Sequence, residues 1–395
     1  MKTITAILIA STVVGASVAE ACTSWAIRPE VSESGLMIVQ KTLDERYRDR
    51  LDADIRVAPN GWRWIRVGSF KFGASMSMNE KGVVVTSNCG DITDIQTPFW
   101  DRDPMGNYEL QRAVMKNCSA AADGVELLKN ILRNRRFRAR PNTGYVLLVA
   151  DAHRAFMIEI GDGYAEAAEV TGGMHVVVNS WMLPGGEELS VRELPGLRVN
   201  RAREACAVKL LQERRVNGKY TLRGCFDTSR AIRGRATNQK NPFVHGVRDP
   251  KNMSLETACF EIDPEFPEYL SCTYLALGPQ RHMVYLPVPM AVRQLPDKMR
   301  DGRWAEMAYS HQEAFGPEHT DLEKISDLED KFLAEFKAVR AEARKLLREG
   351  KKAEAAKLLN DCFDRQYAEA DKLMTALYAA AKEKLKTSKT EPRKE

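Results

Sequence analysis

Short apolar runs rich in β-branched and aromatic residues recur from residue 22 to residue 289 and constrain the fold most strongly. Several runs come in pairs that a few turn-forming residues join, as Asp151-Ala152-His153 joins Tyr145–Ala150 to Ala155–Ile160. Short apolar runs paired in this way predict antiparallel hairpins. The other predicted strands are Cys22–Arg28, Leu36–Lys41, Trp62–Val67, Gly82–Ser87, Met174–Asn179, Thr273–Leu277 and His282–Pro287.

Helical periodicity separates some of these runs. Apolar residues recur with the spacing of one helix face in Tyr108–Met115, Ala120–Leu132 and Arg201–Leu211. Strand blocks that helices interrupt are typical of an α+β domain in which helices cover antiparallel sheets. We therefore expect one layered domain over residues 22–310.

The C-terminal part has a different pattern, which predicts a helical hairpin over residues 320–386. An apolar stripe at helical spacing runs from Leu322 to Leu346, Gly350 interrupts it, and a second stripe runs from Leu358 to Tyr378. Each stripe packs either on the chain's own domain or against a second copy, so a homo-oligomer stays open. Residues 387–395 are expected to form a polar tail.

The first 21 residues have the pattern of an export signal. Lys2 gives a short positive start, Ile4 to Val18 carry no charge, and Ala19-Glu20-Ala21 place small residues where a signal peptidase reads them. The apolar run is too short for a comfortable membrane span. Since no later stretch is comparably apolar, we expect a mature protein without a stable membrane span, secreted or periplasmic.

Composition and spacing argue against several classes of protein. Charged residues make up 29% of the chain with a formal net charge of +5, a mixture of signs that predicts no nucleic-acid partner. The arginine-rich run from Arg133 to Arg140 fits a solvated loop rim better than a nucleic-acid patch. The eight cysteines have no CxxC spacing and the six histidines no HExxH spacing, so we expect no metal and no cofactor. His245 is expected to be structural.

Cys22 directly follows the expected cleavage point after Ala21. Cleavage there leaves a thiol and a free α-amine on one residue, and an α-amine has an ordinary pKa of about 7.7–8.0. The amine can therefore accept the thiol proton near neutral pH and activate the thiolate without a histidine. Cys22 is thus a candidate N-terminal nucleophile.

Two other interpretations of Cys22 stay open from the residues alone. Cys22 could be the lipid-modified cysteine of an envelope lipoprotein, although such signals favour a large aliphatic residue where this chain has Ala19. It could also be an ordinary buried or disulfide-bonded cysteine, because export permits disulfides. The pairing of the remaining seven cysteines cannot be read from the sequence.

Four short motifs follow in order along residues 22–307. They are Cys22-Thr23-Ser24-Trp25, a strand that ends in Lys41-Thr42-Leu43-Asp44, Met78-Asn79-Glu80-Lys81-Gly82 followed by a strand to Asn88, and Met174 to Ser180. This order resembles the cysteine-type N-terminal-nucleophile hydrolases, which include choloylglycine hydrolases and acyl-CoA:6-aminopenicillanic acid acyltransferases. The strands at Tyr274–Pro279 and Val284–Pro287 are similar to those of the related secreted cysteine dipeptidases.

The resemblance implies roles for residues around Cys22. Asn88 would donate to the oxyanion, Asn179 would orient the free amine and the substrate, and Asp44 would hold the amine by a charge-assisted hydrogen bond. Strand-end turns would also explain both asparagines, because asparagine favours turns. A surface ion pair with Arg46 or Arg48 would equally explain Asp44.

Three basic residues complete the implied site. Arg201 resembles the family's later active-site arginine, and Arg198 is a close rival. Lys41 stands where the family has an arginine, so it keeps the charge of a substrate-binding side chain but loses the planar fork.

The resemblance implies a four-layer αββα sandwich, with two antiparallel sheets between helix layers. It also implies hydrolysis of a small linear amide, such as an N-acyl amino acid or a dipeptide-like compound, through a thioester on Cys22. An acyltransferase of the same fold would use the same acyl-enzyme with an amine acceptor. A non-enzymatic, lipid-anchored envelope protein is the alternative from another class.

Overall fold

The computed structural model describes residues 22–46, 51–69, 73–90, 105–134, 144–161, 164–186, 194–231, 252–316, 319 and 321–390. The expected export signal, His245, Arg48 and most of the run from Arg133 to Arg140 lie outside the described residues. The side chains of Asp44 and Arg198 are also outside them, although their backbones are described in a strand and a helix.

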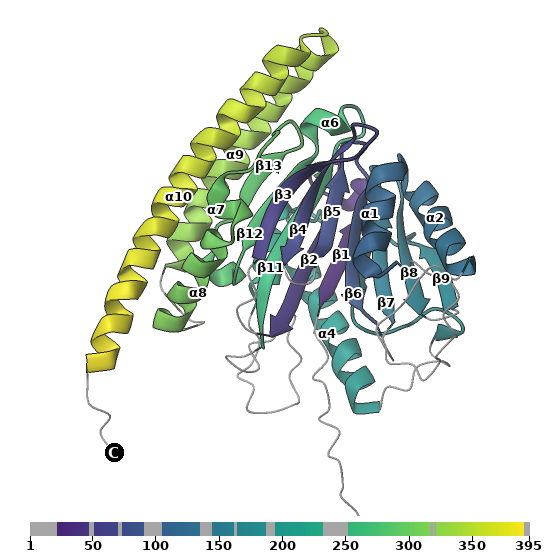
Figure 1. The fold of residues 1–395 in the computed structure, drawn as a ribbon, viewed down its shortest axis with the longest axis horizontal. Helices are drawn as coiled ribbons and strands as arrows, with labels where there is room; N and C mark the ends of the chain where they lie inside the picture. Colours follow the sequence, from purple (N-terminus) through teal and green to yellow (C-terminus); the bar gives the residue numbers. More distant parts are fainter. Residues whose placement is uncertain are drawn as a thin grey trace, which may run out of the picture.

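Two antiparallel sheets form the centre of the molecule (Figure 1). The first has six strands in the order β10-β1-β2-β11-β12-β13, and the second has seven strands in sequence order from β3 to β9. The six-stranded sheet comprises β1 (Thr23–Ile27), β2 (Met37–Arg46), β10 (Met174–Val177), β11 (Asn252–Ile262), β12 (Cys272–Leu277) and β13 (Leu286–Pro289). The seven-stranded sheet comprises β3 (Leu51–Val57), β4 (Arg63–Ser69), β5 (Gly73–Asn79), β6 (Val84–Cys89), β7 (Tyr145–Ala150), β8 (Ala155–Gly161) and β9 (Tyr164–Glu169).

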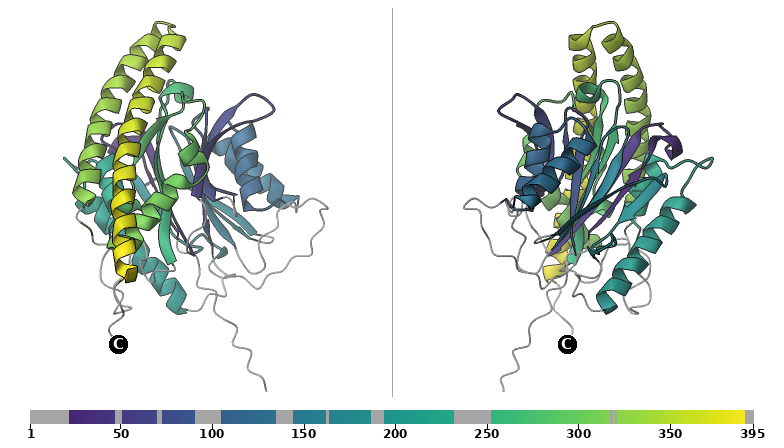
Figure 2. Two further views of the ribbon diagram at one scale, coloured as in Figure 1. Left: turned by 60° about the vertical axis from the view of Figure 1, so that its left-hand side comes forward. Right: turned by 90° about the vertical axis from the view of Figure 1, so that its right-hand side faces the viewer.

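Helices cover the outer face of each sheet, while the inner faces contact each other through β1, β2, β6 and β7 (Figures 1 and 2). Helices α1 (Asn107–Asn117) and α2 (Ala121–Arg133) pack on the seven-stranded sheet. On the six-stranded sheet lie α4 (Leu194–Glu213), α5 (Leu222–Ser229), α8 (Arg303–Phe315), α9 (Leu322–Arg348) and α10 (Lys352–Thr390). The predicted α+β fold with four αββα layers is therefore confirmed.

Because side chains alternate between the two faces of each strand, the seven-stranded sheet contributes to two buried apolar clusters. Leu147 and Val149 of β7 join the buried cluster under α1 and α2, whereas Val146 and Leu148 join the cluster that faces the other sheet. Successive side chains of a strand point to opposite faces, so a strand buried on both faces is a continuous apolar run. This is why the sequence predicted Tyr145–Ala150 with the bounds that β7 has.

Four strands were missed by the sequence analysis. These are β3, β5, β9 and β11, whose sequences alternate apolar with charged residues or are rich in small residues. For β9, YAEAAE lacks β-branched residues and contains alanine and glutamate, which are depleted in strands. Its pairing with β8 supplies the order that the local sequence does not.

The C-terminal helices α9 and α10 lie side by side and form a long hairpin (Figures 1 and 2). Their apolar stripes pack on β13 and share one buried cluster with the six-stranded sheet, through residues such as Phe332 and Phe363. In the part of the chain that the structure describes, no helix combines the length and hydropathy needed to cross a bilayer.

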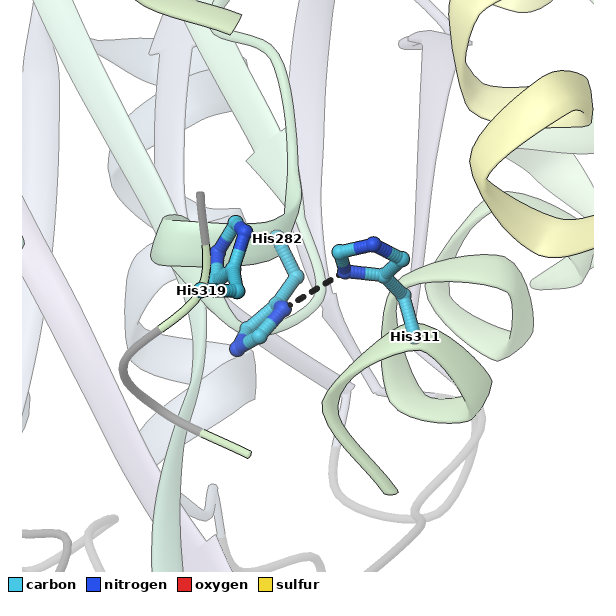
Figure 3. Close-up of side chains that lie close together, drawn as sticks. All are labelled: His282, His311 and His319. Carbon is cyan, nitrogen blue, oxygen red and sulfur yellow. Dashed lines mark hydrogen bonds between the residues drawn. The ribbon is translucent and has the colours of Figure 1, made fainter. Parts of the chain in front are cut away.

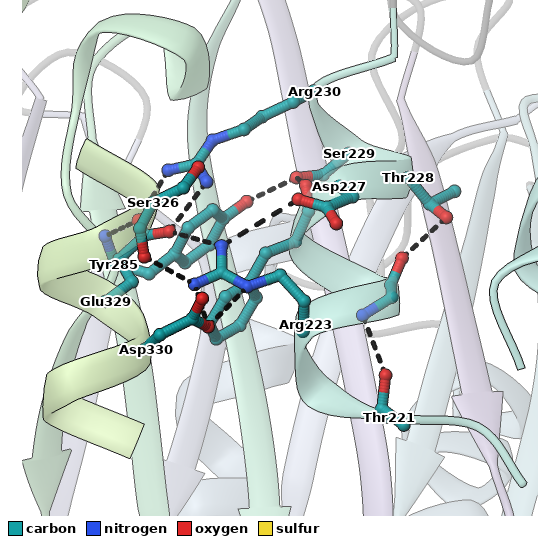
Figure 4. A network of polar contacts seen from close by, with 12 residues as sticks. Thr221, Arg223, Asp227, Thr228, Ser229, Arg230, Tyr285, Ser326, Glu329 and Asp330 are labelled. Atoms are coloured by element: carbon teal, nitrogen blue, oxygen red, sulfur yellow. Dashed lines mark hydrogen bonds and ion pairs between the residues drawn. The ribbon is translucent and has the colours of Figure 1, made fainter. Parts of the chain in front are cut away.

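A buried ion pair fixes α9 to the main domain (Figure 4). Glu329 of α9 is fully buried and accepts hydrogen bonds from Arg230 Nη1 at 2.7 Å and from Arg223 Nη1 at 2.8 Å. The backbone N–H of Tyr285 also donates to this carboxylate at 2.7 Å. Because several donors satisfy the buried charge, the pair can bear its desolvation cost and define how α9 docks.

Candidate active site

Cys22 stands at the head of β1, a strand that lies between β10 and β2 in the six-stranded sheet. The residue is 1% exposed, so its backbone and thiol are held inside the molecule. Its backbone nitrogen donates a hydrogen bond to Oδ1 of Asn179 at 2.8 Å. The two residues are far apart in the sequence, and the pairing of β1 with β10 brings them together.

Asn179 follows β10 and is fixed by contacts to both sheets. Its Nδ2 donates to the carbonyl of Cys89 at 2.6 Å, and its Oδ1 accepts a second hydrogen bond from Arg203 Nη2 at 2.6 Å. The amide therefore presents its oxygen to two donors and its nitrogen to a carbonyl, which defines its orientation. The result is an acceptor aimed at the backbone nitrogen of Cys22.

Helix α4 supplies the arginine of this network, and the residue is Arg203. Arg203 is 4% exposed and also donates to Oδ1 of Asn200 at 3.0 Å. Asn200 in turn donates from Nδ2 to the carbonyl of Asn179 at 3.0 Å and to Ser180 Oγ at 2.7 Å. Asn200 and Arg203 are one helical turn apart, so they share the buried face of α4.

Arg201, the arginine singled out from the sequence, lies on a different face of α4 and its side chain is exposed. The structure therefore does not bring Arg201 to Asn179. The side chain of Arg198 lies outside the described residues. The missed signal was periodicity, because Arg203 shares a helix face with the buried Ala207 and Leu210.

Asn88 lies on β6, opposite the head of β1. Its Oδ1 accepts a hydrogen bond from Ser24 Oγ at 2.9 Å, and its Nδ2 donates to the carbonyl of Val177 at 3.1 Å. An amide nitrogen carries two hydrogens, so this contact uses one of them. Ser24 is two residues after Cys22 and faces the same side of β1, which places Asn88 beside the candidate nucleophile.

Lys41 is the cross-strand neighbour of Ser24 on β2 and is 1% exposed. Its ammonium group donates to the carbonyl of Ser87, so it links the two sheets. Ser87 Oγ accepts from Asn107 Nδ2 at 2.8 Å and from Gln111 Nε2 at 3.0 Å, both on α1. The structure thus gives Lys41 an internal partner next to the site.

The backbone of Asp44 lies at the same end of the six-stranded sheet as Cys22. Thr23 of β1 is level with Thr42 of β2, so Asp44 lies on the neighbouring strand just past the level of Cys22. The side chain of Asp44 lies outside the described residues.

Trp181 closes one side of this region, two residues after Asn179. Its indole packs against Gly90, Gly144 and Gly161, and a Cβ added at Gly161 would lie 2.6 Å from the ring. The following turn is anchored by the buried carboxylate of Glu159, which accepts the backbone N–H of Leu183 at 3.1 Å. Sequence analysis missed this wall because its glycines come from three separate strand ends.

Five other cysteines are free thiols whose environment disfavours the thiolate. Burial raises the pKa of Cys118, Cys225 and Cys362 to about 12. Burial also raises the pKa of Cys259 and Cys272 well above the ordinary value. Since the thiolate is the attacking species, these five are poor candidates for a nucleophile.

Comparison with solved structures found, among others, chains of two enzymes. Two variants of conjugated bile acid hydrolase from Clostridium perfringens align with 11% and 12% identity and TM-scores of 0.45 and 0.41. The alignments cover 71% and 65% of this chain and 98% and 89% of those chains. Penicillin V acylase from Agrobacterium tumefaciens aligns with 13% identity and a TM-score of 0.35, over 68% of this chain and 86% of that one. No protein-family model matches the chain, and no curated protein matches it.

Proposed function

We propose that the chain is an exported cysteine amidohydrolase that cleaves a small linear amide after removal of residues 1–21. The observation that carries the proposal is the hydrogen bond of 2.8 Å from the Cys22 nitrogen to Asn179. After cleavage this nitrogen becomes the α-amine. A buried acceptor is thus already aimed at the group that must act as the base.

The amine would work as a proton shuttle. The Cys22 thiol gives its proton to the amine and Sγ attacks the substrate carbonyl, forming a tetrahedral intermediate. As the C–N bond breaks, the protonated amine transfers this proton to the leaving nitrogen, and a thioester remains. The amine then deprotonates a water that hydrolyses the thioester, which releases the acid and restores the thiol.

Burial and Arg203 would both favour the neutral, proton-accepting form of the amine, whereas Asp44 would favour its charged form. Burial opposes a positive charge, and so does the guanidinium of Arg203, which contacts the same Oδ1 of Asn179. Asn179 would hold the amine lone pair toward the thiol. In this scheme Arg203 and Asn200 are positioning residues, because they act through Asn179.

The oxyanion would be stabilised from β6. The second Nδ2 hydrogen of Asn88 is the proposed donor, since the first is donated to Val177. One donor to an oxyanion contributes about 2.7–4 kcal/mol to the transition state. Asp44 would support the amine from β2.

The position of Cys22 supports the enzyme over a lipid-anchored protein. An anchored cysteine needs a tether that lets its acyl chains reach a bilayer, whereas β1 begins at Thr23, directly after Cys22. Acylation of the buried thiol or amine would also displace the contact to Asn179.

The test combines the mature N-terminus with activity. Protein collected from the exported fraction is sequenced from its N-terminus and weighed intact, then assayed on N-acyl amino acids and dipeptide-like amides. We expect a start at Cys22 without added mass, turnover by the native protein, and loss of turnover in Cys22→Ala and Cys22→Ser. Cys362→Ala, a change at a buried thiol of α10, serves as the control and should keep activity. Full activity in Cys22→Ala, or a blocked amine in the active protein, would refute the mechanism.

A further inference from the structure

Three histidines that are distant from Cys22 in the sequence meet on the outer side of the six-stranded sheet (Figure 3). His282 ends the short helix η2 (Gln280–His282) after β12, His311 lies in α8, and His319 precedes α9. One ring nitrogen from each residue can be chosen so that all three lie within 4.8 Å of one another. Half of the chain's six histidines therefore gather at one place without any short sequence motif.

The outward nitrogens of two rings are held by acceptors. His311 Nε2 lies 3.3 Å from Oδ2 of Asp321, and His319 Nε2 lies 2.6 Å from the carbonyl of Arg281. An acceptor on one nitrogen fixes the tautomer and leaves the lone pair on the other nitrogen. Here that other nitrogen is Nδ1 in both rings. A carboxylate or carbonyl partner of this kind accompanies most histidines that bind metals.

Within the described ranges, the protein alone leaves several ring nitrogens of the cluster with a shared hydrogen bond or with none. His311 Nδ1 lies 2.8 Å from His282 Nδ1, and these two share one hydrogen bond. Among the described residues, His319 Nδ1 and His282 Nε2 are buried and have no hydrogen-bond partner. Buried polar atoms without a partner are rare in native proteins and call for an explanation such as an ion.

Burial disfavours the charged form of all three rings, and a metal ligand must be the neutral form. Burial lowers the pKa of His311 and of His319 below the ordinary value, and it lowers that of His282 to about 2. Positive charge on His319 or His311 lowers the pKa of His282 further. The charges of Arg281 and Arg230 also lower this pKa. The cluster therefore offers lone pairs rather than cations.

We propose that His282, His311 and His319 bind a divalent transition-metal ion of the zinc class. Zn²⁺ prefers three or four nitrogen and sulfur ligands, with Zn–N distances of about 2.0–2.1 Å in tetrahedral geometry. Tetrahedral angles at those bond lengths separate the nitrogens by about 3.3 Å, which lies within the 4.8 Å that the three rings already satisfy. Three imidazole nitrogens leave one tetrahedral position, which water would fill.

The ion would join three elements that the chain connects only through turns. It would tie the end of β12, helix α8 and the start of α9 together, next to the Arg230–Glu329 ion pair. A ligand that binds only the folded chain stabilises it. The site would therefore stabilise the docking of the C-terminal hairpin, and it shares no residue with the contacts of Cys22.

The first experiment measures metal in the untagged, full exported chain. The protein is stripped with a chelator, dialysed against Zn²⁺, desalted and analysed for metal content, and a second sample is loaded with Co²⁺. We expect one Zn²⁺ per chain, the strong visible absorption of four-coordinate Co²⁺, and a lower Tm after chelation. A metal content well below one ion per chain in the native protein would overturn the proposal.

Variants locate the site. His311→Gln and His319→Gln should lose the ion and the Co²⁺ absorption, and their Tm should no longer respond to a chelator. His153→Gln, a change at an exposed histidine, should behave as the native chain does. Asp321→Asn keeps all three rings and removes only the carboxylate behind His311, so Zn²⁺ affinity should fall about 10–100-fold. Unchanged metal content in His311→Gln would contradict the proposal, and circular dichroism confirms that each variant is folded.

Discussion

The side-chain oxygen Oδ1 of Asn179 accepts a hydrogen bond of 2.8 Å from the backbone nitrogen of Cys22, although 157 positions separate the two residues in the sequence. The contact depends on the antiparallel pairing of β1 with β10, in which Ser24 is level with Val177. The nitrogen that would become the base is thus held by a side chain that lies just after the neighbouring strand β10.

Replacement of Asn179 tests whether this contact serves catalysis. In Asn179→Ala the amine loses its acceptor, and we expect kcat/KM on a cleaved amide to fall about 10²–10⁴-fold, the usual contribution of a positioned acid–base group. Asn130→Ala, at an exposed residue of α2, is the control. Unchanged kcat/KM in a folded Asn179→Ala protein would remove Asn179 from the mechanism.

Arg203 and Arg201 are predicted to differ sharply. Arg203→Ala removes a guanidinium that donates to Asn179 and Asn200, so we expect a loss of about 1.5–3 kcal/mol in the free energy of unfolding. Arg201→Ala, at an exposed position, should change it by less than about 0.5 kcal/mol. Urea denaturation of both variants makes the comparison, and equal losses would contradict the assignment of Arg203.

The glycines around Trp181 are predicted to be essential for packing. In Gly144→Ala the added Cβ would overlap the indole ring, so we expect destabilisation of about 1–3 kcal/mol. Gly172→Ala is the matched control, because no heavy atom lies within 4 Å of a Cβ at that position. Thermal unfolding followed by tryptophan fluorescence tests both changes, and a Gly144→Ala protein as stable as the native chain would show that Trp181 has room to move.

Acidification should destabilise the chain through His282. Its pKa is lowered from 6.5 to about 2 in the folded protein, so between these values the unfolded chain binds a proton that the folded chain does not. Stability from this group is present above about pH 6.5 and falls by about 1.4 kcal/mol per pH unit below it. Denaturation in a chelating buffer at several pH values should give a flatter profile for His282→Gln, and identical profiles would count against a neutral buried ring.

Local sequence patterns predicted many of the strands. Continuous apolar runs placed β7 and β12 within a residue of their bounds, because a strand buried in a sheet needs apolar side chains wherever it contacts a core. The strand starting at Cys22 and the segment ending at Asn179 were both predicted. Strand β9 was not, since its order comes from its neighbour β8.

The sequence did not identify which arginine of α4 contacts Asn179. Arg198, Arg201 and Arg203 lie within two turns of α4, and the motif resemblance did not separate them. The direction of each side chain depends on which face of α4 packs on the sheet. The buried Ala207 and Leu210 define that face and select Arg203.

The sequence by itself determined the layered α+β class, the helical hairpin and the candidate nucleophile, because each is written in residues close together in the chain. Tertiary structure alone decided that Arg203 contacts Asn179, that Lys41 is buried against Ser87, and that His282 meets His311 and His319. The physical reason is that these contacts depend on sheet order and on which helix face docks. Both are settled by packing between distant segments and have no local period to record them.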